Sequence, residues 1–327
     1  MSSNAAYEHV LEVKQLKTYF PVRKGLLQQV SGYVKAVDDV SFQVRKGESF
    51  GIVGESGCGK STTGRSLLRL MEPTGGQVYF EGEEVTAFSA ARMREVRRDM
   101  QMIFQDPFAS LNPRHRVRKI LEEPLIVHGV GDAKERRERV EQVMETVGLS
   151  PWQLERFPHQ FSGGQRQRIA IARALMLQPK LIVADEPVSA LDVSIQSQIL
   201  NLMQDLRDQF QLTYVFIAHD LSVVKHFCDR VAVMYLGRIV EIGDKHSLYR
   251  EPKHPYTQAL LSAVPNPDPN AVKERIILQG EVPSPSNAPQ GCVFHTRCPL
   301  AMERCRTERP QLQRISGEHE AACHLYP

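Results

Sequence analysis

The chain has 327 residues, of which 42% are hydrophobic and 24% are charged, enough for one large domain with an appendage or for two domains. Its formal net charge of +3 is too small to indicate a nucleic-acid-binding protein. No apolar run reaches the roughly 18 residues of a membrane span, and the N-terminal segment lacks the basic and apolar regions of a secretory signal. We therefore expect a cytoplasmic chain, and structural disulfides are rare in that compartment.

The first third of the chain predicts β-structure around a glycine-rich turn. The segments "VLEVKQLKTYF" and "VKAVDDVSFQV" alternate between apolar and polar residues, as half-buried strands do. The segment "SFGIVGESGCGKSTTGRSLLRL" then runs from an apolar strand through a glycine-rich turn into a helix. After it, "GGQVYFEGEEV" predicts a hairpin.

The middle of the chain predicts helices and then a parallel sheet. From about residue 106 to 178 the apolar spacing is helical, as in "RERVEQVMETVGL", and the basic runs 91–98 and 134–139 are interpreted as solvated helix faces. The short apolar runs "LIVADEP" and "TYVFIAHD" are typical of strands buried on both faces. The helical segment "SIQSQILNLMQDLRDQF" between them completes a βαβ unit, which indicates an α/β fold.

A phosphate-binding loop is the first motif that carries chemistry. "GESGCGKST" fits G-x-x-x-x-G-K-[ST], in which backbone N–H groups surround phosphate oxygens, Lys60 adds positive charge and the Ser61 hydroxyl can ligand Mg²⁺. The small side chain of Cys58 is interpreted as tolerated at a variable position, with redox sensing as the alternative. The residues predicted to bind ATP through this loop are Gly54, Glu55, Ser56, Gly57, Cys58, Gly59, Lys60, Ser61 and Thr62.

An acidic pair ends the apolar strand "LIVADEP". Asp185 is placed to hold Mg²⁺ through water, and Glu186 is placed to polarise an attacking water molecule. Acidic pairs at strand ends are common on protein surfaces, which is the alternative interpretation. The phosphate-binding loop earlier in the same chain favours the catalytic one.

The segment "FSGGQRQRIAIARAL" lies between these two motifs and resembles the signature of the ATP-binding cassette (ABC) ATPases, with Ser162, Gly163, Gly164 and Gln165 at the matching positions. The resemblance extends over about residues 9–250. The other family motifs follow in order, namely Gln105 in "MIFQDP" (Q-loop), Asp192 in "SALD" (D-loop) and His219 in "IAHD" (switch histidine). Phe20 stands where the family carries an aromatic that stacks on adenine, with Tyr19 as the second choice.

This resemblance implies an ABC-type P-loop NTPase with a β-rich, RecA-like core and an inserted helical subdomain at about 106–178. It implies that Glu186, His219 and Gln105 act in hydrolysis, and that Ser61, Gln105 and Asp185 hold Mg²⁺. In the family, two cassettes meet head to tail and each signature acts on ATP bound by the other. Since this chain holds one cassette, we expect a second ATPase chain, and a heterodimer is favoured.

The C-terminal part of the sequence resembles a narrower group within this family. "HPYTQALLSAVP" and "GEVPSPSNAPQGCVFHTRCP" resemble the C-terminal extension of dipeptide and oligopeptide permease ATPases, most closely the F-type subunit, which gives a cassette at 9–250 and an extension at 251–327. This implies peptide import at the cytoplasmic face of the plasma membrane, as a peripheral subunit. The implied partners are two transmembrane permease subunits and, indirectly, an external substrate-binding protein, with no nucleic acid.

Three alternatives remain beside peptide import. The first is the ATPase of a related importer of nickel, glutathione or murein peptide. The second is a soluble ABC ATPase of DNA repair or translation, although the paired cassettes, long coiled coil or basic arms of that class are absent from the sequence. The third is a regulatory module with an inactive site, which the presence of Gln105, Glu186 and His219 disfavours.

Four of the 6 cysteines lie in the tail, namely Cys292, Cys298, Cys305 and Cys323. A cytoplasmic location disfavours disulfides. Four thiolates suit Zn²⁺, but the tight C-x(2–4)-C pair usual in such sites is missing. A [4Fe–4S] cluster accommodates longer loops, and relatives among the peptide importers carry one in this extension. We expect the cluster, in a structural role, with zinc and free thiols as alternatives, and we expect Cys228 to be a buried core thiol.

The segment "DPFASLNP" after Gln105 opens the helical region. In the family, this region forms the groove for a short helix of the permease. The resemblance therefore makes Phe108 and Leu111 candidate contacts of the membrane subunits, with burial in the subdomain core as the alternative.

Overall fold

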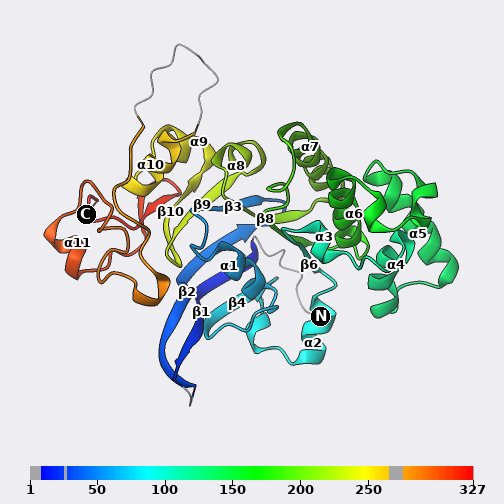
Figure 1. Ribbon diagram of the computed structural model, residues 1–327, viewed down its shortest axis with the longest axis horizontal. Coiled ribbons are helices and arrows are strands. Elements are labelled where there is room, and N and C mark those ends of the chain that lie inside the picture. Colours follow the sequence, from blue (N-terminus) through cyan, green and yellow to red (C-terminus); the bar gives the residue numbers. More distant parts are fainter. Residues whose placement is uncertain (1–8, 26–27, 265–274, 327) are drawn as a thin grey trace, which may run out of the picture. The chain divides into compact units, whose positions relative to one another are not determined.

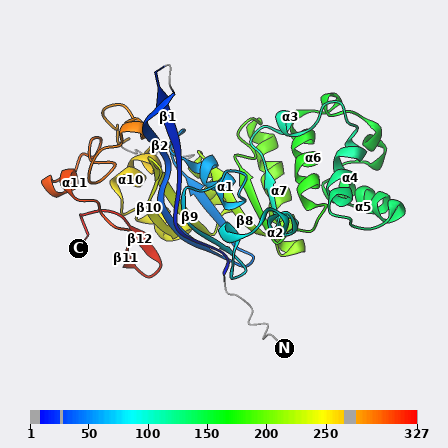
Figure 2. The same ribbon diagram turned by 90° about the horizontal axis from the view of Figure 1, so that it is seen from below.

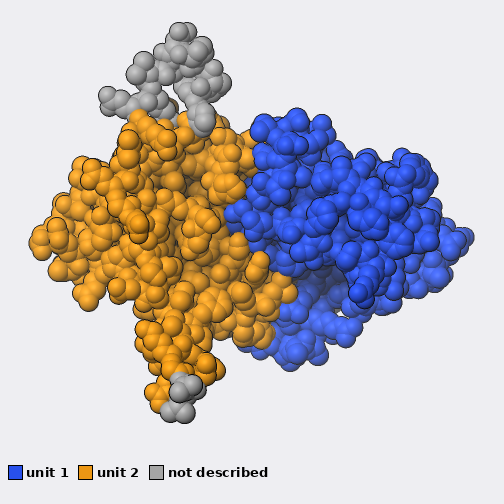
Figure 3. All heavy atoms as spheres, viewed as in Figure 1, with its two compact units in different colours: residues 1–10, 45–48, 87–217 blue, residues 11–44, 49–86, 218–327 orange. Residues whose placement is uncertain are grey.

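The computed structural model describes residues 9–25, 28–264 and 275–326. The chain divides into two compact units (Figure 3). Each unit contains helices and strands. Unit 1 comprises residues 1–10, 45–48 and 87–217, and unit 2 comprises residues 11–44, 49–86 and 218–327. The elements confirm the predicted α/β class.

Unit 2 contains a four-stranded sheet in the order β2-β1-β4-β5 (Figures 1 and 2). The strands are β1 (His9–Lys24), β2 (Gln29–Arg45), β4 (Gly75–Phe80) and β5 (Glu83–Glu84). As predicted, β4 and β5 form an antiparallel hairpin, in which Phe80 pairs with Glu83. Burial along β1 follows the apolar positions of the sequence, and Leu11, Val13 and Leu16 are at most 2% exposed.

A second group of strands in unit 2 positions the phosphate-binding loop. β3 pairs in parallel with β9, and β9, β10, β12 and β11 then follow with antiparallel pairing. Their bounds are β3 (Ser49–Val53), β9 (Arg230–Tyr235), β10 (Arg238–Asp244), β11 (Gln313–Ser316) and β12 (His319–Ala321). All five residues of β3 are buried, and six residues separate its end from the start of α1 (Lys60–Leu67).

The helix α8 (Leu221–Phe227) precedes β9 and packs on β3. Cys228 ends this helix and is fully buried. A Cβ added to Gly51 would lie only 2.9 Å from Sγ of Cys228, so this thiol is closely packed against β3. The prediction that Cys228 is a core residue is confirmed.

Unit 1 contains the predicted βαβ unit. β7 (Leu181–Asp185) and β8 (Thr213–Ala218) are parallel and wholly buried, and α7 (Val193–Phe210) connects them. β6 (Met100–Ile103) pairs in parallel with the other edge of β7. Parallel pairing puts the carboxyl ends of these strands on one edge of the sheet, which is where ligands bind in such folds.

Helices make up most of the remainder of unit 1, as predicted for residues 106–178. They are α2 (Ala90–Val96), α3 (Pro107–Ser110), α4 (Val117–Val127), α5 (Ala133–Thr146) and α6 (Gly163–Leu175), with 3₁₀ turns at Pro151–Glu155 and Pro158–Gln160. α4, α5 and α6 pack on one another (Figures 1 and 2). A capping box between Asp132 and Glu135 satisfies the first N–H groups of α5.

The tail is loop-rich, as predicted, and follows α9 (Lys245–Arg250). Its short elements in unit 2 include α10 (Pro255–Ser262), a 3₁₀ turn at Pro285–Asn287 and α11 (Glu303–Thr307). Phe294 is fully buried in a small aromatic core, with its ring centroid 5.3 Å from those of Tyr235 and Tyr256. Within the described part of the chain, no helix has the length and apolar character needed to cross a bilayer.

Candidate active site

The phosphate-binding loop joins β3 to α1 and is tightly packed. Gly59 has φ of 105°, and a Cβ at this position would lie 1.9 Å from the carbonyl oxygen of Ala36, so glycine is required there. Lys60 is 4% exposed, and its Nζ donates to the carbonyl oxygens of Gly54 at 2.7 Å and Glu55 at 3.0 Å. The loop thus holds a buried ammonium group through its carbonyl oxygens, which keeps a positive charge on a loop whose backbone N–H groups can bind an anion.

Cys58 lies inside this loop and is only 5% exposed. Burial raises the pKa of its thiol, so the side chain stays protonated at neutral pH. Redox-sensing cysteines need an accessible thiolate. The geometry therefore favours the interpretation of Cys58 as a small packing residue.

Gln105 and Glu186 meet within unit 1, although 81 residues separate them in sequence. The side-chain amide Nε2 of Gln105 donates to Glu186 Oε2 at 3.1 Å. Glu186 directly follows β7, has φ of 44°, and its backbone N–H donates to the carbonyl oxygen of Ile217 at 2.9 Å. The carboxylate is therefore fixed at the end of the parallel strands, where a bound water molecule could be activated.

The predicted signature forms the N-terminus of α6. Ser162 and Gln165 make a capping box, in which the Ser162 hydroxyl accepts from the Gln165 N–H at 3.3 Å and Gln165 Oε1 accepts from the Ser162 N–H at 3.0 Å. A Cβ on Gly164 would lie 2.6 Å from Ile195 Cγ2, so α6 approaches α7 too closely for a larger residue. Gly163 and Gly164 leave the positive end of the α6 dipole without side chains in front of it.

The remaining predicted site residues lie at strand and helix ends. Asp185 is the last residue of β7 and is fully buried, Asp192 directly precedes α7, and the exposed His219 directly follows β8. Ser61 and Thr62 are in the first turn of α1. Phe20 in β1 is 37% exposed, whereas the Tyr19 hydroxyl donates to Asp38 Oδ1 at 2.6 Å. Exposure makes Phe20 the better surface for stacking a base.

Two contacts of the phosphate-binding loop could not be expected from sequence spacing. The Tyr256 hydroxyl accepts a hydrogen bond from the Glu55 N–H at 2.9 Å, and Arg297 forms an ion pair with the Glu55 carboxylate. These residues lie 201 and 242 positions away from Glu55. The family resemblance of the tail was the only sequence signal near them, and it gave neither residue a role.

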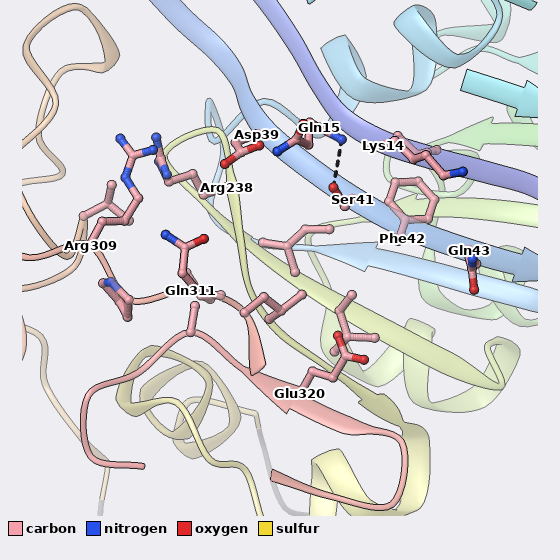
Figure 4. A pocket seen from close by; sticks show the side chains of 18 of the residues that line it. Lys14, Gln15, Asp39, Ser41, Phe42, Gln43, Arg238, Arg309, Gln311 and Glu320 are labelled. Carbon is pink, nitrogen blue, oxygen red and sulfur yellow. Dashed lines mark hydrogen bonds between the residues drawn. The ribbon is translucent and has the colours of Figure 1, made fainter. Parts of the chain in front are cut away.

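A separate cavity of about 450 Å³ lies in unit 2 between β1, β2, β10 and the tail (Figure 4). Arg238 and Arg309 line one part of it, but Arg238 is already in an ion pair with Asp38. No residue of the loop Gly54–Thr62 contributes to its lining. The cavity is therefore distinct from the candidate nucleotide site.

The four tail cysteines do not form the metal site that was expected. Within residues 9–25, 28–264 and 275–326, no group of three or more His, Cys, Asp or Glu side chains is placed to hold a metal ion. All six cysteines are free, and Cys292 and Cys305 are buried, whereas Cys298 and Cys323 are half-buried. Burial, followed by the nearby Cys305, Cys323 and Cys298, raises the pKa of Cys292 to about 11. The neighbouring thiols contribute to the raised pKa of Cys292, but the described arrangement supports neither [4Fe–4S] nor zinc ligation.

Comparisons with known proteins agree on the family. Residues 37–189 match the ABC transporter family model, and residues 240–305 match the model of the oligopeptide/dipeptide transporter C-terminal region. The chain is 56% identical to the oligopeptide transport ATP-binding protein AppF of Bacillus subtilis, over 98% of this chain and 99% of that protein. It is 52% identical to the di/tripeptide transport ATP-binding protein DppF of Pseudomonas aeruginosa, over 97% and 98% of the two chains.

A solved structure supports the fold independently. The ATP-binding cassette MJ0796, in a dimeric post-hydrolysis state with ADP and Pi, aligns with a TM-score of 0.64 and 29% identity, over 72% of this chain and 98% of that chain. The names of the relatives favour peptide transport over the alternatives of another cargo, DNA repair or translation. The chain belongs to the ABC transporter family, in the branch of oligopeptide and dipeptide transport ATP-binding proteins, and is a transport ATPase.

Proposed function

We propose that this chain binds and hydrolyses Mg–ATP to power the import of dipeptides or oligopeptides. The observation that carries the proposal is the hydrogen bond between Gln105 and Glu186 at the ends of parallel strands, in a chain that also holds Lys60 in a phosphate-binding loop. A regulatory module with an inactive site would not need a glutamate fixed in this way.

The phosphate-binding loop would hold the triphosphate. In the described conformation, Lys60 is bound by the carbonyl oxygens of Gly54 and Glu55, so its ammonium lies within reach of an anion seated on the same loop. The backbone N–H groups of Gly54–Thr62 would bind phosphate oxygens, and the exposed ring of Phe20 would stack on adenine. Ser61, Gln105 and Asp185 supply oxygen ligands of the kind that Mg²⁺ prefers, and the ion would neutralise charge on the phosphates.

Glu186 would activate the attacking water molecule, with Gln105 orienting it. Its carboxylate already accepts one hydrogen bond from Gln105, which fixes the direction of the remaining lone pairs. His219 would contact the γ-phosphate from the end of β8, where it is exposed. Asp192 would act in the D-loop, between Glu186 and α7.

A second ATPase subunit would complete the site. Ser162, Gly163, Gly164 and Gln165 form a capped helix N-terminus with a dipole that favours a phosphate group. In the proposed head-to-tail dimer, this terminus acts on ATP bound by the other subunit. The dimeric MJ0796 cassette supports such an arrangement, and a heterodimer suits a chain that resembles the F-type subunits.

ATP hydrolysis by this chain would power transport through two transmembrane permease subunits, to which an external binding protein would deliver the peptide. The exposed surface at Phe108 supports this part of the proposal, because this residue is 60% exposed and is the third residue after Gln105. Leu111 is 1% exposed and belongs to the core, so only one of the two candidate contacts is available to a partner. The chain would then be a peripheral subunit at the cytoplasmic face of the plasma membrane.

A [4Fe–4S] cluster on Cys292, Cys298, Cys305 and Cys323 is a separate proposal, with zinc as its alternative. The support is the match of residues 240–305 to the oligopeptide/dipeptide transporter C-terminal region, together with the contribution of Cys305, Cys323 and Cys298 to the raised pKa of Cys292. Ligation would require the thiols to lose their protons and draw together, because they form no ligand set in the described arrangement. Iron, sulfide and zinc are measured in protein purified without oxygen, and protein lacking all three would exclude both metals.

Peptide import is tested with the whole transporter in proteoliposomes. ATP-dependent uptake of a labelled tripeptide should require this chain, the second ATPase subunit and both permease subunits. Uptake of nickel or glutathione in the same vesicles, without peptide uptake, would support the alternative cargo. ATP hydrolysis stimulated by ribosomes or DNA, rather than by the permease subunits, would contradict the proposal.

A further inference from the structure

The tail of the chain contacts the phosphate-binding loop at the acidic residue Glu55. Arg297 Nη1 and Nη2 donate to the two carboxylate oxygens of Glu55 at 2.8 and 3.3 Å. Glu55 is the second residue of the loop and directly follows Gly54, whose carbonyl oxygen accepts from Lys60. Two parallel hydrogen bonds from one guanidinium make this a geometrically specific contact.

Arg297 is held in place by its surroundings. Its side chain is 8% exposed, its backbone N–H donates to the Phe294 carbonyl oxygen at 3.0 Å, and its guanidinium lies 6.0 Å from the centroid of the Tyr235 ring. Phe294 is fully buried against Tyr235 and Tyr256. The Arg297 side chain is therefore already ordered, so pairing with Glu55 costs less side-chain conformational entropy than an ion pair at the surface does.

The position of Glu55 makes this contact relevant to nucleotide binding. A carboxylate on the phosphate-binding loop repels the polyphosphate, whereas the loop otherwise presents N–H donors and Lys60 to it. The Arg297 guanidinium neutralises that carboxylate. Without Arg297, the negative charge of Glu55 would remain beside the anion. Because the Glu55 side chain is only 28% exposed, water would not fully screen that charge.

We propose that Arg297 of the C-terminal extension is a positioning residue of the nucleotide site, which neutralises Glu55 and so raises the affinity of the phosphate-binding loop for ATP. The extension thereby sets the ATP affinity of the cassette to which it is attached. This inference rests on the proposed assignment of Gly54–Thr62 as the phosphate-binding loop.

The test compares the two partners of the ion pair, because an electrostatic role and a merely structural role predict different signs. Arg297→Gln should weaken ATP binding on the order of fivefold, since it leaves the Glu55 carboxylate uncompensated. Glu55→Gln should tighten ATP binding, since it removes the repulsive charge while Arg297 remains. Kd for Mg–ATP is measured by titration calorimetry on the full-length chain, and KM and kcat are measured in the assembled transporter.

The double variant Arg297→Gln/Glu55→Gln should recover most of the affinity lost in Arg297→Gln. The loss in Arg297→Gln should also shrink when NaCl is raised from about 0.05 M to about 0.5 M, because salt screens the remaining carboxylate. The change should appear in KM with kcat little altered. Arg304→Gln is the matched control, since Arg304 pairs with Glu308 inside the extension and is 61% exposed, and it should leave Kd unchanged.

The outcomes separate this inference from the assignment of the loop. If both single variants weaken ATP binding equally and the double variant is not rescued, the contact is only structural and the inference is wrong. If Arg297→Gln binds ATP like the wild type while Lys60→Ala does not bind, the inference is again wrong but the loop assignment stands. If Lys60→Ala binds ATP normally, the loop assignment itself fails.

Discussion

His319 and Glu241 form a buried pair in which Nε2 of the imidazole lies 2.6 Å from Oε1 of the carboxylate. Glu241 is fully buried in β10, and it also accepts the backbone N–H groups of Lys253 and His254 at 2.6 and 2.9 Å. One carboxylate therefore connects β10, the turn before α10 and β12. This network therefore joins the extension to β10, in addition to the aromatic core around Phe294.

Glu241→Gln should destabilise the chain. The amide cannot bear the charge that binds His319 and two backbone donors, and buried polar groups that lose partners are costly. We expect a loss of about 2–3 kcal/mol in the free energy of unfolding, measured by urea denaturation. Glu251→Gln is the control, because Glu251 pairs with Lys253 at the surface, and it should leave stability unchanged. Equal midpoints for the two variants would contradict the role assigned to Glu241.

The stability of the chain should fall with acid partly through His254. Burial lowers the pKa of His254 from 6.5 to about 4, against the nearby charge of Glu241, and its Nδ1 accepts the Tyr256 N–H at the start of α10. Because the unfolded chain binds this proton more readily, the stabilisation is complete above about pH 6.5 and is lost as the pH falls toward about 4. The loss amounts to about 3 kcal/mol over that range.

His254→Asn tests this dependence, since asparagine still offers an oxygen to cap α10 but does not titrate. Urea midpoints measured between pH 7.5 and 4.5 should decline less steeply in His254→Asn than in the wild type. His246→Asn is the control, because His246 lies in the first turn of α9, and it should keep the wild-type slope. Parallel slopes for the wild type and His254→Asn would show that His254 does not titrate in this range.

The features that the sequence predicts well depend on neighbouring residues or on a pattern that repeats along the chain. The loop around Lys60, the strand ending at Asp185 and the helix after Ser162 each depend on neighbouring residues, so their spacing was sufficient to place them. The contact between Glu55 and Arg297 spans 242 residues and depends on how the tail folds back. No periodicity encodes such a distance, and the pairing of β12 with β10 was missed for the same reason.

The tail cysteines and the segment after Gln105 show a second limit of prediction from sequence. The four cysteines and the family resemblance of the tail predicted a shared metal, but a ligand set depends on positions within a fraction of an ångström, and the described residues contain no such set. Likewise, Phe108 and Leu111 are three residues apart and both apolar, yet one is exposed and the other buried. Which of the two is exposed depends on tertiary packing, which the spacing of apolar residues does not encode.

Glu186→Gln should keep ATP binding but lose hydrolysis. Glutamine can accept the hydrogen bond from Gln105 or from water, but it cannot take up a proton from the attacking water molecule. General-base catalysis of this kind is worth about 10²- to 10⁴-fold, so turnover should fall by at least about 100-fold while Kd for Mg–ATP changes little. The same measurements on Glu155→Gln, a surface glutamate paired with Arg116, should match the wild type. Wild-type turnover in Glu186→Gln would disprove the catalytic assignment.

Phe108→Asp should uncouple peptide uptake from ATP hydrolysis in the assembled transporter. The Arg166 guanidinium lies 3.5 Å from the centroid of the ring and covers one of its faces. Because Phe108 is nevertheless 60% exposed, the rest of the ring offers an apolar surface to a partner beside the Q-loop. A carboxylate there would disfavour an apolar contact with the permease, while nucleotide binding by the isolated chain should be unchanged.

Trp152→Asp is the matched control for this prediction. Trp152 is 63% exposed and also lies beneath an arginine, with the Arg156 guanidinium 4.4 Å from its ring, but it lies in a 3₁₀ turn away in sequence from Gln105. Uptake of labelled tripeptide per ATP hydrolysed should fall in Phe108→Asp and stay at the wild-type ratio in Trp152→Asp. Loss of nucleotide binding in Phe108→Asp would instead indicate that the ring stabilises the fold, and an unchanged ratio would place the permease contact elsewhere.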